Sequence, residues 1–96
     1  MKEMWEYFLL RCINSLGGKA YLEQIYIKIP EFIELNEDHW KEQYGRPAYQ
    51  HQIRSHIANL CQSGNLDKIS RGEYSLTGKG KEKLLREKSR ENPIEI

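Results

Sequence analysis

The chain has 96 residues, of which 39% are hydrophobic and 30% are charged, and its formal net charge is +1. This length and balance predict one compact domain with a modest core, and they exclude a disordered chain. No apolar run approaches the ~20 residues that a membrane span needs, and the N-terminus has no signal peptide pattern. We therefore expect a cytoplasmic protein that has no membrane partner.

The charges are unevenly distributed along the chain. Residues 1–40 hold four basic and seven acidic residues, a net charge of −3, and residues 41–96 hold 11 basic and seven acidic residues, a net charge of +4. Such an asymmetry is typical of a domain with one side that faces nucleic acid. Random scatter in a short chain is the alternative interpretation.

The first part of the chain predicts two helices and a short strand. Apolar residues at helical spacing predict a helix over residues 3–16, which Gly17-Gly18 ends by supplying positive φ. The stripe consists of Trp5, Phe8, Leu9, Cys12, Ile13 and Leu16. Ala20-Tyr21-Leu22 is expected to be extended and to pair with a later hairpin as a third strand. A second helix is expected from Leu22 to about Ile29.

The middle of the chain is predicted to be more irregular. Pro30 should end the second helix, because proline lacks an N–H and restricts the residue before it. Residues 31–35 are expected to form a displaced turn, and Asn36 is suited to cap a short helix. Gly45-Arg46-Pro47 is expected to break the chain.

The segment from Arg46 to Thr77 carries the most informative pattern. A third helix is expected to begin with Pro47 in its first turn and to end at Gly64. Its inward positions are Tyr49, Ile53, Ile57, Leu60 and Cys61. Strands at 66–69 and 73–76 then form a hairpin with Arg71-Gly72 at its tip. Helix, break and hairpin in this order predict a mainly α fold with a small β-hairpin wing, an α+β winged helix-turn-helix.

A last helix is expected from Gly78 to about Arg90, with Thr77 as its N-cap. Residues 1–90 would then form the winged-helix domain. Residues 91–96 resemble a linker or tail, which we expect to lead to a further domain of a longer protein.

The third helix and the hairpin tip are the candidate DNA-binding surface. No acidic residue occurs between Arg46 and Asn65, and a recognition helix meets base edges with residues near its N-terminus. The residues expected to face bases are Tyr49, Gln50 and Arg54, and those expected to hold phosphates are Arg46, Lys68, Arg71 and Lys79. The alternatives are a solvated polar helix face, a solubilising turn at the tip, and a core position for Tyr49.

The sequence supplies no pattern for catalysis, a metal or a cofactor. Cys12 and Cys61 do not form a Cys-x-x-Cys pair, and His51 and His56 are five residues apart, so they point to different sides of a helix. Gly78-Lys79-Gly80-Lys81 lacks the spacing of a phosphate-binding loop. We therefore expect reduced thiols, no small-molecule substrate and no enzyme activity from this chain by itself.

The same segment resembles a known family. The motifs are Ile53-Arg54, Leu60 and Gly64-Asn65-Leu66, followed by the run Arg71-Gly72-Glu73-Tyr74-Ser75-Leu76-Thr77-Gly78-Lys79-Gly80. They are similar to the N-terminal winged-helix domain of Mrr-type restriction proteins over roughly residues 5–85. The third helix lacks the tryptophan common in that family and has Ser55 about where it would fall. The resemblance implies double-stranded DNA binding, as the target-reading domain of a restriction endonuclease.

Two kinds of partner stay open at this point. Duplex DNA is the expected partner, together with a second copy of the chain in a homodimer. The alternative is a winged-helix module for protein–protein interaction or dimerisation, in which the acidic first half of the chain would be the contact surface.

Overall fold

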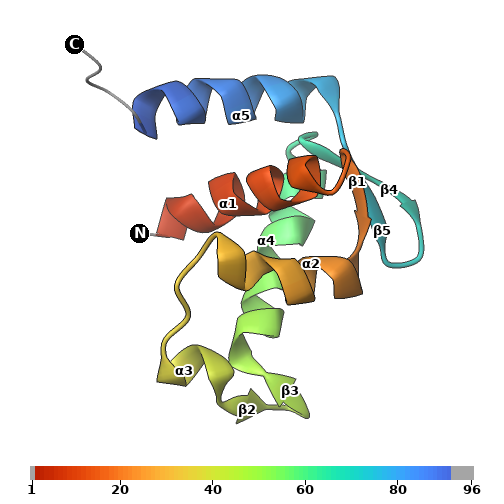
Figure 1. Cartoon of the computed structure of the whole chain (residues 1–96). Coiled ribbons are helices and arrows are strands. Elements are labelled where there is room, and N and C mark those ends of the chain that lie inside the picture. Colours follow the sequence, from red (N-terminus) through yellow and green to blue (C-terminus); the bar gives the residue numbers. More distant parts are fainter. Residues whose placement is uncertain (1, 92–96) are drawn as a thin grey trace.

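The computed structural model describes residues 2–91, with side chains placed for residues 5–42 and 44–87 (Figure 1). It is a mainly helical α+β structure with a small three-stranded antiparallel sheet. The elements are α1 (Lys2–Ser15), β1 (Lys19–Tyr21), α2 (Leu22–Lys28), the 3-10 turn η1 (Ile29–Glu31), α3 (Glu37–Trp40), β2 (Glu42–Gln43), β3 (Arg46–Pro47), α4 (Ala48–Gln62), β4 (Leu66–Ser70), β5 (Glu73–Leu76) and α5 (Gly78–Glu91). Glu91 belongs to α5 rather than to the tail, and the rest of the predicted tail, residues 92–96, lies outside the described residues.

The helices α2, α4 and α5 pack against α1. In Figure 1, α5, α1 and α2 lie one below another and α4 crosses them, with the β4–β5 hairpin at one side. Apolar residues of α1 and α4 dominate the core, and Leu9, Ile13, Ile53 and Leu60 are completely buried. Burying each such side chain contributes about 1.5–3 kcal/mol to the free energy of unfolding, so the apolar contact between α1 and α4 is the main source of stability.

The core of α1 is broader than the sequence predicts. Leu9, Cys12 and Ile13 are buried as expected, but Tyr7 and Leu10 are buried too, and Trp5, Phe8 and Leu16 are only partly buried. The prediction assumed a single apolar stripe. In the structure α1 lies between α4 and α5, so two of its faces are covered (Figure 1).

The small sheet has the order β1-β5-β4. Ala20 pairs with Tyr74, and Leu66 pairs with Leu76, which confirms the expected third strand. The backbone N–H of Leu22 also donates to the carbonyl of Gly72 at 2.7 Å. The tip of the β4–β5 hairpin is therefore tied to the first residue of α2.

The start of α4 differs from the prediction. Pro47 is the N-cap residue of α4, and the first helical residue is Ala48. The expected break before it is a second, very short hairpin, in which β2 and β3 pair across a turn that includes Tyr44 at φ 53 and Gly45 at φ 86. Strands of two residues carry no readable alternation, which is why the sequence did not predict them. The end of α4 is as expected, with Gly64 at φ 85.

The two predicted helix caps are confirmed. The Oδ1 of Asn36 accepts from the backbone N–H of His39 at 3.0 Å, at the start of α3. The Oγ1 of Thr77 accepts from the backbone N–H of Gly80 at 3.0 Å, at the start of α5. Through residue 91, none of the helices combines the length and apolar character that crossing a bilayer requires.

Candidate functional site

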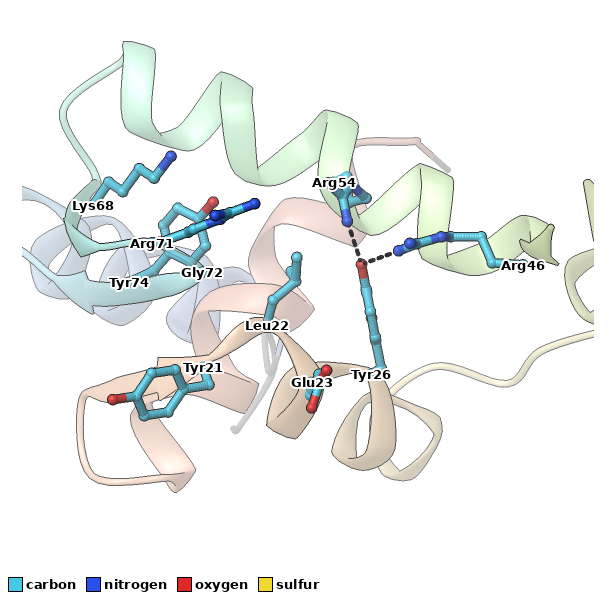
Figure 2. A pocket seen from close by; sticks show the side chains of 10 residues that line it. All are labelled: Tyr21, Leu22, Glu23, Tyr26, Arg46, Arg54, Lys68, Arg71, Gly72 and Tyr74. Carbon is cyan, nitrogen blue, oxygen red and sulfur yellow. Dashed lines mark hydrogen bonds between the residues drawn. The ribbon is translucent and has the colours of Figure 1, made fainter. Parts of the chain in front are cut away.

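A cleft of about 550 Å³ opens between α2, the first half of α4 and the β4–β5 hairpin. Four cationic side chains line it, Arg46 and Arg54 from the α4 side and Lys68 and Arg71 from the hairpin (Figure 2). The approach of the hairpin to α4 thus gathers cations that lie up to 25 positions apart in the sequence. Four of the seven predicted DNA-binding residues meet here.

The two arginines on the α4 side share one hydrogen-bond acceptor. The Nη1 atoms of Arg46 and of Arg54 each donate to the hydroxyl oxygen of Tyr26 at 3.3 Å. Tyr26 is on α2 and only 8% exposed, and its hydroxyl lies between the two guanidinium groups (Figure 2). These bonds fix the heads of two otherwise flexible side chains at one wall of the cleft.

The charge of the cleft is unbalanced. Over the part of the chain that the structure describes, none of its four cations forms an ion pair with a carboxylate. Glu23 is the one acidic side chain among the lining residues. Glu73 on the neighbouring strand is engaged elsewhere, because it lies 3.9 Å from the Nζ of Lys19 and accepts from Ser70 at 2.8 Å. A concave surface with excess cations concentrates positive potential and attracts anions.

A second cleft continues the first along α4 towards its C-terminal end. Its volume is about 560 Å³, and it shares Arg54, Lys68 and Tyr74 with the first cleft. Burial raises the pKa of Tyr74 and the pKa of Cys61, which also lines this second cleft. Both groups are therefore neutral at pH 7, and together the two clefts form one groove whose charge comes from the cations.

Tyr49 does not belong to this surface. It is 5% exposed, and its hydroxyl donates to the backbone carbonyl of Tyr26 at 3.2 Å. Of the two interpretations left open by the sequence, the core position is correct, and the expected base contact from Tyr49 is wrong. Gln50 is half-buried beside it, with its Nε2 3.5 Å from the Tyr49 hydroxyl, and it lines neither cleft.

Lys79 lies at the opposite end of α4 from Arg46. Its Nζ donates to the carbonyl of Ser63 at 2.7 Å, directly after the last residue of α4. A cation at this position stabilises the unsatisfied carbonyls and the negative end of the helix dipole. Lys79 lines neither half of the groove, so the structure does not bring it together with the other predicted phosphate contacts.

Tyr26 is a site residue that the sequence did not reveal. At helical spacing it falls on the inward face of α2, and its ring does pack edge-on against Tyr49 at 6.4 Å. Its hydroxyl nevertheless reaches the cleft. The partners Arg46 and Arg54 come 20 and 28 residues later, so only the tertiary structure shows the contact.

A separate cluster of aromatic and ionisable side chains joins α1, α3 and α4. His56 stacks on Trp5 at 6.0 Å between ring centroids, and its Nδ1 is 3.1 Å from Glu6 Oε2. His39 meets the edge of the same Trp5 ring. Among the side chains that the structure places, residues 5–42 and 44–87, no three histidine, cysteine or acidic groups are arranged to hold a metal ion. The cluster connects three helices and lies apart from the groove.

The arrangement is suited to binding an extended anion. It offers a concave run of cations and tyrosine rings between a helix and a hairpin, with Glu23 as the one carboxylate among the lining residues.

Comparison with models of protein families, with curated proteins and with solved structures finds no match for this chain.

Proposed function

We propose that this chain is a winged helix-turn-helix module that binds duplex DNA. In this proposal α4 is the recognition helix in the major groove, and the β4–β5 hairpin is the wing, which contacts the backbone or the minor groove. The observation that carries it is the convergence of four cations without ion-pair partners between α4 and the hairpin, within the described residues. The two elements that the proposal places on DNA thus bring four cations together on one surface.

Two further features support this proposal. The exposed side of α4 carries Gln52, Ser55 and Ala58, which are short or polar enough to approach base edges. No acidic residue occurs on α4, so no carboxylate would face the negative phosphates from this helix. We propose a binding role rather than a catalytic one, with the target-reading domain of a restriction endonuclease as the context that the sequence resemblance suggests.

The test is a fluorescence anisotropy titration of a random-sequence duplex at several salt concentrations. If Arg46, Arg54, Lys68 and Arg71 neutralise four phosphates, log K should fall with log salt at a slope of about −3 to −4. Arg71→Ala should weaken binding to most DNA sequences by a similar factor. It should also make the slope of log K against log salt about one unit less negative. A slope near zero would contradict the proposal.

The matched control is Arg86→Ala. Arg86 is exposed on α5 and lines neither half of the groove, so its replacement removes the same charge from a different surface. If the Arg86 variant loses as much affinity as the Arg71 variant, binding follows net charge and not the groove.

A protein-interaction module is the second candidate function. The acidic first half of the chain presents Ile27 on α2 with 80% exposure, and an apolar residue so exposed among polar neighbours suits a contact with another protein or a second copy. Absence of duplex binding at tens of micromolar, together with a dimer in sedimentation that Ile27→Asp dissociates, would favour this candidate.

A further inference from the structure

The hydroxyl of Tyr26 has an unused donor. A phenolic hydroxyl offers one proton and acceptor lone pairs, and here the oxygen accepts from Arg46 and from Arg54. Among the side chains of residues 5–42 and 44–87 and the described backbone, no acceptor takes the Tyr26 proton. The side chain is more than nine-tenths buried, yet its hydroxyl end is at the cleft between the two guanidinium groups (Figure 2).

The same oxygen holds two positive groups close together. Each guanidinium is one hydrogen-bond length from it, and like charges at such short range repel each other. A bound anion would remove this repulsion and accept the unused O–H. Charge-assisted hydrogen bonds from guanidinium to an oxyanion are also roughly twice as strong as the neutral-acceptor bonds that the arginines make to Tyr26.

We propose that Tyr26, Arg46 and Arg54 form one preformed site for a tetrahedral oxyanion, and that its natural occupant is a single backbone phosphate of the bound DNA. The site rests on the proposed function and makes it more specific. Arg54, which the sequence suggested as a base contact, is here a phosphate contact that fixes the position of α4 on the backbone. Tyr26 positions both arginines and donates to the same phosphate.

The surroundings favour a phosphate within a strand over a free small anion. Lys68 and Arg71 line the far wall of the same cleft, and the groove continues along α4 past Arg54. A strand passing through the groove could therefore place one phosphate at Tyr26 and others near the hairpin cations. An isolated anion would use one wall only.

The first experiment uses inorganic phosphate as the probe. Arginine side-chain Nε–Hε signals of the full chain are followed by NMR during a phosphate titration. We expect the Arg46 and Arg54 signals to shift with one shared dissociation constant. Tyr26→Phe keeps the ring that packs on Tyr49 and loses only the hydroxyl, and it should weaken phosphate binding about tenfold, since a hydrogen bond to a charged group is lost.

The control is Tyr7→Phe, which removes a hydroxyl from another buried tyrosine, on α1 and outside both clefts. It should bind phosphate as the wild type does. Circular dichroism and thermal unfolding establish that both variants are folded. Separate constants for Arg46 and Arg54, or unchanged phosphate binding by folded Tyr26→Phe, would overturn the inference.

The second experiment separates this inference from the proposed function. Duplex affinity is measured for both variants, with one phosphate at a time replaced by a neutral methylphosphonate. We expect one phosphate position at which the neutral replacement lowers the duplex affinity of the wild type and of Tyr7→Phe. At that position the replacement should change the affinity of Tyr26→Phe little, because this variant has already lost the contact. Duplex binding that Tyr26→Phe leaves unchanged would overturn the phosphate site and leave DNA binding standing. Phosphate binding with no duplex binding would show a site for a free anion and would overturn both the backbone assignment and the proposed function.

Discussion

Gly80 in α5 packs directly against the backbone carbonyl of Asn65, so closely that a Cβ at position 80 would overlap with that oxygen. Asn65 is itself 6% exposed, and its carbonyl accepts from the N–H of Thr77. The first turn of α5 can therefore approach the turn after α4 only because residue 80 has no side chain.

Gly80→Ala should destabilise the chain by about 2 kcal/mol, because the backbone must move to relieve the overlap. Gly78 lies in the same helix, and a Cβ added there would meet no atom within 4 Å, so Gly78→Ala is the matched control. It should be neutral or stabilising by roughly 0.5 kcal/mol, since alanine is less flexible in the unfolded chain. Urea unfolding measures both values, and equal values for the two variants would contradict the packing described for Gly80.

Lys79→Met should affect stability and leave DNA binding unchanged. The amino group of Lys79 holds the carbonyl of Ser63, so its removal should cost about 0.5 kcal/mol of unfolding free energy. Lys79 lines neither half of the groove, so the duplex affinity should stay within error of the wild type, in contrast to Arg71→Ala. If Lys79→Met loses as much duplex affinity as Arg71→Ala does, then Lys79 does contact DNA and this prediction is wrong.

Glu23→Gln should tighten duplex binding by about threefold, because it removes the one carboxylate that lines the basic cleft. Glu34→Gln is the matched control, since Glu34 is exposed, lies after η1 and lines neither half of the groove. The gain of the Glu23 variant should shrink at high salt, and anisotropy titrations at two salt concentrations measure this. Equal gains for both variants would show that only net charge matters.

Stability should fall at alkaline pH through Cys12. Burial raises the pKa of the Cys12 thiol to about 12 from 9.0, so above pH 9 the unfolded chain loses this proton while the folded chain keeps it. Stability is thus lost between pH 9 and about 12, by up to about 1.4 kcal/mol per pH unit. Cys12→Ala should be less stable than the wild type at pH 7, because it leaves a small cavity, and this difference should narrow by pH 10 in urea unfolding. A difference that does not change with pH would contradict the prediction.

The sequence predicted most of the elements because each has its own local signal. Gly17-Gly18 and Gly64 ended their helices as expected, and Asn36 and Thr77 capped theirs. The β2–β3 hairpin and the second covered face of α1 were not predicted, because the first is too short for a pattern and the second depends on where α5 packs.

The candidate site was only partly predictable for the same reason. Charge and turn chemistry identified Arg46, Arg54, Lys68 and Arg71, which the structure brings to one cleft. They could not show that the hydroxyl of Tyr26 joins two of these cations, or that Lys79 is engaged at the end of α4. Contacts between side chains distant in the sequence depend on how the elements pack.

The two sides of the basic cleft near Gly72 and near Arg46 are held by different kinds of bond. Near Gly72 the hairpin and α2 are joined by a backbone hydrogen bond that continues the β1–β5 pairing. Near Arg46 the cleft is spanned by side-chain bonds from Arg46 of β3 and Arg54 of α4 to the hydroxyl of Tyr26 on α2. Side-chain bonds to a neutral oxygen are exchanged for bonds to a ligand more readily than sheet pairing is broken. We therefore expect the cleft to widen from the Arg46 side, with the Gly72 side acting as its hinge.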